Sequence, residues 1–495
     1  MELKAKFSKW GAGMPVSILN RDTATTLGIN IEETIVISTI SRHSKKISST
    51  VHIVDGNLVR KNEIYVSSEI RKKLHLRKGE RIDVSIAPES KSLVFIKKKL
   101  NNKKLSSEEI DQVIKDIVNN NISDPETALF VAGMSVNGMD MKETIALTSS
   151  ILKYGNKLNL RSDLVVDKHS TGGVAGNRTT PIIVSICAAA GLIFPKTSSR
   201  AITSEAGTAD TIEAVADVEF TLDELKKILK KTGAFIVWGG SFGIAPADAE
   251  IIKIEKTLKI DPKSQMLASI MAKKLAVGSN HILIDIPYGK NAKVSKKKAE
   301  LLKKDFMEIG KYFHKNVTVV LTDGSQPIGN GIGPSLELID IIKILDPKQK
   351  GPEDLKKKSI LLSGKILEMT KKAKKGEGTK KAYEILMSGK AFIKFKQIIA
   401  AQGGNLDRIK PSKFKKEIHS KYSGKIKSID GKKIISLARI LGCPGDKASG
   451  IYIHNHVNDK IKKNDVILTL YSETKYNLNA GIRFCREEKI VEINH

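Results

Sequence analysis

The chain has 495 residues, of which 40% are hydrophobic and 5% aromatic, and it carries a formal net charge of +30. This length suggests about three domains, and the apolar share supports packed cores and excludes an intrinsically disordered chain. The longest uncharged apolar run, Ile182 to Phe194, is shorter than the roughly 20 residues that cross a bilayer, so we expect no membrane association.

The N-terminus reads MELKAKFSKWGAG and lacks the apolar core of a signal peptide, so we expect a cytoplasmic protein. Cys187, Cys443 and Cys485 share no short spacing, which indicates neither a zinc site nor a disulfide framework. The excess of basic residues raises the question of a nucleic-acid partner. These residues are spread along the chain without interleaved aromatics, so we favour attraction of anionic small substrates instead.

Residues 1–92 are predicted to form a β-rich N-terminal module, because short β-branched runs alternate with Gly and Asp turns. A small barrel is the expected architecture. From about residue 106 the apolar residues recur at helical spacing, and Ser106 and Asp140 stand at helix starts. Residues 93–163 are therefore expected to form a small all-α domain, which takes in a second segment from about 245 to 278.

Strands and helices alternate from residue 164 onward, which predicts an α/β domain made of residues 164–244 and about 279–415. Residues 416–495 are expected to form an α+β C-terminal domain. The predicted fold class is thus multidomain α/β. The expected strands are Leu164–Val166, Leu192–Pro195, Ala234–Trp238, Ile282–Ile286, Val317–Leu321, Ile434–Leu437, Gly450–Ile453 and Val466–Leu470, and the expected helices include Thr180–Ala190, Leu222–Thr232 and Ala299–His314.

The first polar loop of interest, Lys168 to Gly173, lies between a predicted strand and a predicted helix. Ligands of α/β sheets gather at the carboxyl ends of strands. Glycines let backbone N–H groups approach an anion closely, and the N-terminus of the next helix adds a favourable partial charge. The candidate phosphate-binding residues are Lys168, Ser170, Gly172 and Thr180. An ordinary strand–helix turn is the alternative for this piece alone.

The second polar loop, Thr197 to Arg200, follows another strand candidate and leads to a further hydroxyl-rich turn at Gly207-Thr208. Arg200 offers a planar fork of donors. Asp210 and Glu213 follow closely. Three hydroxyl-rich turns within one short stretch indicate a site that holds a small anion against a sugar.

The segment from Ser198 to Glu213 resembles the signature of the thymidine phosphorylase family, S-x-R-x-[IL]-x-x-x-x-G-T-x-D-x-[IL]-E, and Asp167–Gly173 resembles that family's phosphate loop. The similarity extends over about residues 95–490. The N-terminal module, Val174–Asn177 and Val237–Gly240 resemble the long branch of the family, which contains the archaeal AMP phosphorylases. The resemblance implies phosphorolysis of an N-glycosidic bond, with inorganic phosphate as co-substrate and no metal or organic cofactor. It also implies a homodimer, and the N-terminal module offers a means of larger assembly.

Site roles follow from the resemblance position by position. It implies that Asp261 is the proton donor to the departing base. Read alone, Asp261 would be a turn or cap residue, Ser269 a helix-surface hydroxyl and Lys293 a solvated charge. The nucleotide-binding positions that it implies are Gly173, Ser199, Arg200, Ala201, Ile202, Thr203, Ser204, Thr208, Ser269 and Lys293.

Two departures from the family pattern bear on the substrate. The pyrimidine branch has an arginine that holds the base, yet Asp248–Ser269 contains no arginine. Lys168, in contrast, is typical of a pyrimidine-type phosphate loop. We expect conversion of AMP and phosphate to adenine and ribose 1,5-bisphosphate, with CMP and UMP as further candidates. The alternatives are a thymidine or pyrimidine-nucleoside phosphorylase that gives a sugar 1-phosphate, and a non-catalytic nucleic-acid-binding protein on the same scaffold.

Overall fold

The structure, a computed structural model, describes residues 1–7, 11, 14–31, 33–41, 44–88, 90–160, 162–201 and 204–494. Its internal contacts divide the chain into two compact units. The first unit comprises Met1–Gly155 and Ala245–Ser269, and the second comprises Asn156–Ile244 and Ile270–His495. The four domain ranges given above are finer than this division and stay predictions.

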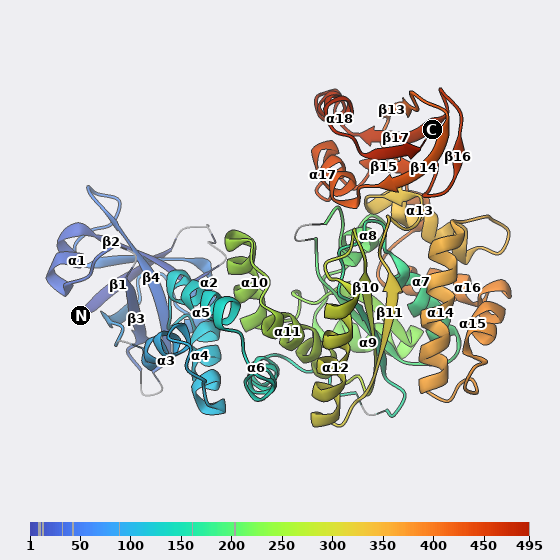
Figure 1. Ribbon diagram of the computed structural model, residues 1–495. Helices are drawn as coiled ribbons and strands as arrows, with labels where there is room; N and C mark the ends of the chain where they lie inside the picture. Colours follow the sequence, from blue (N-terminus) through green and yellow to red (C-terminus); the bar gives the residue numbers. More distant parts are fainter. Residues whose placement is uncertain are drawn as a thin grey trace. The chain divides into compact units, whose positions relative to one another are not determined.

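The first unit begins with a closed six-stranded barrel, whose strand order is β1-β5-β2-β4-β3-β6 (Figure 1). Leu19, Ile37 and Val51 point into its core and are fully buried. The barrel confirms the predicted architecture of this region, although no sequence pattern had indicated β1 and β5. The elements are β1 Glu2–Phe7, β2 Val16–Asn20, α1 Arg21–Leu27, β3 Thr34–Thr39, β4 Lys46–Val54, β5 Glu63–Val66, α2 Ser68–Leu74 and β6 Arg81–Ile86.

Helices make up the rest of the first unit. Ser106 and Asp140 cap their helices in reciprocal capping boxes with Glu109 and Glu143, which confirms both predicted helix starts. Helix α10 returns from later in the chain and packs against α4 and α5. The helices are α3 Lys91–Leu100, α4 Ser107–Asn119, α5 Asp124–Asn137, α6 Met141–Lys153, α10 Pro246–Leu258 and α11 Lys263–Ala276, the last of which continues into the second unit.

The second unit is built on parallel strands. Strands β11, β10 and β7 form one sheet, β8 and β9 form a pair, and a parallel bridge between Val165 and Ile193 joins the two. The carboxyl ends of β7 and β8 therefore meet at one edge, so the two polar loops that follow them are neighbours. The strands are β7 Val166–Ser170, β8 Phe194–Ser198, β9 Ala234–Trp238, β10 His281–Tyr288 and β11 Asn316–Asp323.

Helices of the second unit pack on these strands, and α7 is buried almost throughout because it contacts both α14 and α16. This explains its nearly continuous apolar sequence. In the described part of the chain, no helix has both the length and the hydropathy to cross a bilayer. The helices are α7 Thr179–Ala189, α8 Thr208–Glu213, α9 Leu222–Thr232, α12 Lys296–Tyr312, α13 Pro334–Leu345, α14 Glu353–Met369, α15 Gly378–Met387, α16 Lys390–Ala401 and the 3₁₀ turn η1 Leu406–Arg408.

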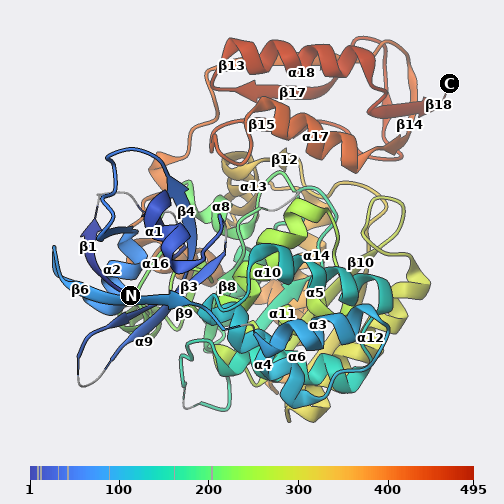
Figure 2. The same cartoon turned by 90° about the vertical axis from the view of Figure 1, so that its left-hand side faces the viewer.

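The C-terminal part contains two antiparallel sheets, of order β12-β15-β17-β13 and β16-β14-β18. Helices α17 and α18 contact each other, and Figure 2 shows both of them running alongside strands β15 and β17. The multidomain α/β class is thus confirmed, with a barrel, a helical part, an α/β part and a C-terminal part. The elements are β12 Gly331–Ile332, β13 Phe414–His419, β14 Gly424–Ile429, α17 Gly431–Leu441, β15 Gly450–Ile453, β16 Lys460–Ile461, β17 Val466–Ser472, α18 Lys475–Glu487 and β18 Val491–Asn494.

The prediction of a strand at Ile434–Leu437 was wrong, because these residues lie in helix α17. Asp430 accepts hydrogen bonds from the backbone nitrogens of Lys432 and Lys433 and starts the helix. The buried residues Ile434, Leu437, Ala438 and Leu441 recur at helical spacing. The strand prediction had relied on the two β-branched residues Ile434 and Ile435 and had not considered the helical spacing of the longer segment.

Several strands differ from their predicted extents, and two of these differences concern the polar loops. Strand β7 continues to Ser170 and β8 to Ser198, so Lys168 and Thr197 belong to strands rather than to loops. Their neighbours decide this, since Lys168 pairs with Leu283 on β10 and Thr197 pairs with Val237 on β9. Both side chains are consequently buried.

Candidate functional site

The first polar loop turns through two glycines between β7 and α7. The backbone angle φ is 81° at Gly172 and 94° at Gly173, in the left-handed region that favours glycine. A Cβ atom on Gly173 would lie only 2.7 Å from the backbone nitrogen of Lys293. The structure therefore brings together two predicted nucleotide-binding positions, Gly173 and Lys293, and requires glycine at one of them.

The four candidate phosphate-binding residues gather at this loop. The Lys168 ammonium donates hydrogen bonds to the hydroxyls of Thr179 at 3.0 Å and Thr180 at 3.4 Å. The Ser170 hydroxyl accepts from the Asn177 amide at 3.2 Å and from the Gly172 backbone nitrogen at 3.5 Å. Thr179 is also the first residue of α7, so these groups surround a helix N-terminus, where an anion is stabilised.

The charge of Lys168 is only partly compensated. Its side chain is 1% exposed, and burial lowers the pKa of Lys168 to about 8. Asp285, on β10, acts against this fall, with its carboxylate oxygen 4.0 Å from the ammonium, whereas the charges of Lys358 and Arg178 add to it. A cation that is buried and incompletely paired is well suited to a small anion.

A second buried group of charges lies around Asp167, the residue before Lys168. Its carboxylate lies 2.7 Å from the Lys274 ammonium and 3.8 Å from that of Lys196. Burial, with the charge of Lys274, holds the pKa of Lys196 well below its usual value. Burial and the same lysines hold the pKa of His169 well below 6.5, so its imidazole is neutral. This group has more lysines than carboxylates and adds positive potential near the loop.

Arg178 links the two polar loops from within the protein. Its guanidinium pairs with Glu337 of α13, with Nε 2.5 Å from one carboxylate oxygen and Nη2 3.2 Å from the other. The same Nη2 donates to the Ala206 carbonyl oxygen at 2.9 Å and lies 3.5 Å from Glu205. Glu205 in turn accepts a hydrogen bond from the Gly176 backbone nitrogen at 3.0 Å. The phosphate loop and the signature segment are thus tied by one buried network.

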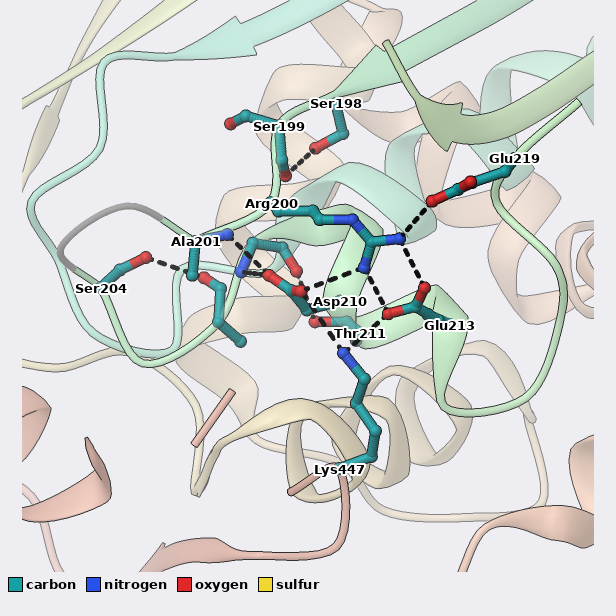
Figure 3. Close-up of polar contacts among 12 residues, drawn as sticks. Ser198, Ser199, Arg200, Ala201, Ser204, Asp210, Thr211, Glu213, Glu219 and Lys447 are labelled. Carbon is teal, nitrogen blue, oxygen red and sulfur yellow. Dashed lines mark hydrogen bonds and ion pairs between the residues drawn. The ribbon is translucent and has the colours of Figure 1, made fainter. Parts of the chain in front are cut away.

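The arginine of the signature is held by carboxylates (Figure 3). Its guanidinium binds Glu213 through two hydrogen bonds of 2.5 and 2.6 Å, and Glu219 at 2.8 Å. It also lies 5.0 Å from the centre of the Trp238 ring. Hydrogen bonds from Arg200, with added bonds from Lys447, lower the pKa of Glu213 to about 2. In this structure Arg200 stabilises the loop. Its positive charge is already paired with carboxylates, so less of that charge is available to a ligand.

Asp210 explains the spacing of the signature. Its carboxylate accepts hydrogen bonds from the backbone nitrogens of Ala201 at 2.7 Å and Gly207 at 2.8 Å, and so closes the loop on itself (Figure 3). A Cβ atom on Gly207 would collide with the Ser199 carbonyl oxygen, so this position needs glycine. The arginine, the glycine and the two acidic residues of the motif therefore hold the loop in one closed conformation.

The other described residues of this segment lie on or beside the loop that Asp210 closes. Ser199 accepts at its carbonyl oxygen from the Ser198 hydroxyl, and the Ser204 hydroxyl donates to the Ala206 carbonyl oxygen. Thr208 is the first residue of α8. Ile202 and Thr203, two predicted nucleotide-binding positions, lie outside the described residues.

Asp261 and Ser269 belong to the first unit, whereas the loops above belong to the second. Asp261 lies between α10 and α11, directly before Pro262, and Ser269 lies within α11. The roles that the resemblance implies for these two residues stay predictions. Within the described part of the chain, no cluster of three or more His, Cys, Asp or Glu side chains is placed to hold a metal ion.

Sequence reasoning missed several charged residues that the structure places near the loops. Asp285 had a usable signal in the sequence, because it is an acidic residue within the apolar run of strand β10. The structure shows that it is buried. Glu337 had a similar signal, because it stands between Leu336 and Leu338 in an apolar helix. Lys358 and Lys447 had none, since each stands among ordinary polar residues of a helix or loop.

Family models of known proteins match three parts of the chain. A family model described as the glycosyl transferase family a/b domain matches residues 162–392, and one described as the helical bundle domain of that family matches residues 94–155. A third, described as the pyrimidine nucleoside phosphorylase C-terminal domain, matches residues 425–488. All three matches follow the chain order of the parts described above.

Relatives cover nearly the whole chain. The AMP phosphorylase of Pyrococcus furiosus is 43% identical over 88% of each chain, and AMP phosphorylase 1 of Archaeoglobus fulgidus is 38% identical over 100% of this chain and 98% of its own. A Legionella pneumophila protein provisionally named thymidine phosphorylase is 38% identical over 92% of this chain and 88% of its own.

One solved structure supports the fold alone. The anthranilate phosphoribosyltransferase of Thermus thermophilus matches 62% of this chain and 99% of its own, with a TM-score of 0.53 and 18% identity. The relatives above are similar enough, over enough of their length, to show common descent. The chain therefore belongs to the thymidine phosphorylase family of glycosyl-transferring enzymes, which includes the AMP phosphorylases.

Proposed function

We propose that this chain catalyses the phosphorolysis of AMP, which gives adenine and ribose 1,5-bisphosphate; CMP and UMP are further candidate substrates. The observation that carries the proposal is the phosphate loop, where Lys168, two threonine hydroxyls and the start of α7 converge. The full-length similarity to proteins named AMP phosphorylase supports the choice of nucleotide.

The proposed reaction is a displacement at the anomeric carbon of the ribose. An oxygen of inorganic phosphate forms the new C1′–O bond while the bond from C1′ to the base nitrogen breaks. The base leaves with the electron pair of that bond and takes up a proton, for which we propose Asp261 as donor. Lys168, Ser170, Gly172 and Thr180 would hold the phosphate, so that its charge and direction of approach are set before the bond breaks.

The nucleotide would be held by the signature segment and by the segment of Lys293. Gly173 supports this assignment, because its backbone lies directly against Lys293. Arg200 has a mainly indirect part in the proposal, since its guanidinium is bound to Glu213 and Glu219. Ser199, Ala201, Ser204, Thr208 and Ser269 complete the proposed nucleotide contacts, together with Ile202 and Thr203.

The experiment is to incubate the purified protein with phosphate and, in turn, AMP, CMP, UMP and thymidine, and to measure release of the base. Phosphate-dependent release from AMP supports the proposal. Release from thymidine but not from AMP would instead make it a thymidine phosphorylase, which Lys168 and the Legionella relative favour. If no base is released but DNA binds with steep salt dependence, the protein is a nucleic-acid-binding member of the family.

We further propose that the protein works as a cytoplasmic homodimer and needs no metal or organic cofactor. The family membership supports the dimer, and the composition of the proposed site, with lysine and hydroxyl donors for phosphate, supports a reaction without metal. Light scattering at several protein concentrations tests the dimer. A larger particle that is lost on deleting residues 1–92 would assign further assembly to the barrel.

A further inference from the structure

The phosphate-loop lysine shares its nearest carboxylate with a second lysine. The Asp285 Oδ2 atom lies 3.2 Å from Lys358 Nζ and 4.0 Å from Lys168 Nζ. The side chains are 0%, 8% and 1% exposed, in that order. Among the described residues, no other carboxylate comes within 4.0 Å of Lys168 Nζ. Two buried cations therefore compete for one buried anion.

Asp285 cannot readily move toward either lysine. Its other carboxylate oxygen accepts a hydrogen bond from the Thr322 hydroxyl at 2.6 Å, and its backbone oxygen accepts from the Thr171 nitrogen at 3.0 Å. Strand β10, which carries it, is the central strand of its sheet, and Asp285 stands opposite Ser170 in register. The lysines must adapt to the carboxylate.

Lys358 and Lys168 have different interaction partners. Lys358 comes from α14 and has its ammonium within ion-pair distance of Asp285. Lys168 is turned toward the hydroxyls of Thr179 and Thr180 at the start of α7. If Lys358 were neutral, Asp285 would be a buried charge with Lys168 as its nearest cation, and a buried carboxylate strongly favours pairing. Lys168 would then be drawn from the phosphate loop.

We propose that Lys358 is a positioning residue for phosphate: it neutralises Asp285 and so keeps the charge of Lys168 available to the incoming anion. The inference rests on the proposed function in one respect, namely that Lys168 contacts phosphate. It assigns Lys358 no contact with the substrate. The three residues together carry one net positive charge, which a bound phosphate offsets.

The titration of Lys168 supports this arrangement. Burial, with the charges of Lys358 on α14 and Arg178 before α7, lowers the pKa of Lys168 to about 8, while Asp285 on β10 and Asp167 on β7 act in the opposite direction. The charge of Lys358 favours the neutral form of Lys168, so its removal raises that pKa. Affinity for phosphate should thus be lost in the wild type as pH rises through about 8.

The test is a double-mutant cycle in the full-length protein, with Lys358→Met, Asp285→Asn and the combination. Lys358→Met should raise KM for phosphate about tenfold to hundredfold, the range for loss of one charge-assisted contact, while KM for AMP changes little. The combined variant should recover most of the lost affinity, because no carboxylate then competes for Lys168. Lys357→Met removes an exposed lysine from the same helix and serves as the matched control.

A purely structural role for Lys358 predicts the opposite pattern. A packing defect from Lys358→Met would persist or grow when Asp285 is also changed, so failure of the combined variant to recover overturns the proposal. The pH profile gives a second readout: the alkaline limb of kcat/KM for phosphate should move to higher pH in Lys358→Met. If Lys358→Met does not fold, Lys358→Gln and the combined variant with Gln carry the same comparison.

Direct phosphate binding separates this inference from the proposed function. Calorimetry with inorganic phosphate alone needs no nucleotide turnover. A wild-type protein that binds phosphate but cleaves no nucleotide would sink the proposed function and leave the cycle measurable by affinity. Unchanged phosphate affinity in Lys358→Met, with wild-type activity intact, would sink the inference alone.

Discussion

Glu205 offers a prediction that can be worked through in detail. It is 1% exposed and shares Arg178 with Glu337, which holds the better position on the guanidinium. Glu337 also accepts from the Thr211 hydroxyl at 3.0 Å and the Gly333 nitrogen at 3.3 Å, so it has more hydrogen-bond donors around it than Glu205 has. Burial, followed by the charge of Glu337, raises the pKa of Glu205 to about 7.

The sign of the effect on stability follows from proton binding. An acid whose pKa is higher in the folded state keeps its proton there after the unfolded chain has released it, so the free energy of unfolding falls as pH rises between the two values. For Glu205 this window runs from 4.5 to about 7. At about 1.4 kcal/mol per pH unit, the loss across the window approaches about 3 kcal/mol.

The perturbation is Glu205→Gln, which cannot ionise and keeps an oxygen for the Gly176 nitrogen. We expect the variant to gain stability relative to the wild type as pH rises from about 5 to about 7.5, by about 2 to 3 kcal/mol. The chain has two tryptophans, Trp10 and Trp238. In a Trp10→Phe background, the fluorescence of Trp238 reports urea unfolding of the second unit. Glu300→Gln, which changes an exposed glutamate, is the control.

The difference between variant and wild type is the decisive quantity, since the titration of all other groups cancels in it. A difference that stays constant across this pH range would show that Glu205 titrates normally, and the argument from burial and shared Arg178 would be refuted. A difference that falls with pH would mean that the Arg178 pair outweighs burial.

Three further predictions concern the proposed reaction. Asp261→Asn should lower kcat by about 10² to 10⁴, the usual contribution of a general acid, with a small effect on nucleotide KM; lost affinity with intact turnover would remove the proton-donor role. Arg200→Ala should raise KM for the nucleotide or phosphate about tenfold or more, because the loop loses its charge-assisted bonds to Glu213; unchanged values for both substrates would contradict this. Dialysis against a chelator should leave phosphorolysis intact, and recovery by an added divalent ion would show that a metal takes part.

Local sequence signals were enough to predict several helices and strands and to recognise the family signature. Ser106 and Asp140 stand three residues before a glutamate, and both form capping boxes in the structure. The apolar run Ala234–Trp238 forms a strand and the amphipathic segment Leu222–Thr232 forms a helix, both with the predicted bounds. The signature segment, with Lys168 and the glycines upstream, was also recognisable from residue types at fixed spacing. Such signals depend on neighbours within one or two turns, so the sequence displays them directly.

The charge pairings were decided only by the tertiary structure. Arg178 meets Glu337 across 159 positions, and Lys358 meets an aspartate that lies on a different element. The structure of residues 431–441 was also decided by tertiary packing. Burial of one face stabilised helix α17 although the local β propensity favoured a strand. The energy of a buried charge depends on what surrounds it in space, and no local pattern encodes those neighbours. The sequence therefore identified a candidate phosphate loop and a family signature, whereas packing decided which carboxylates the buried lysines and arginines are paired with.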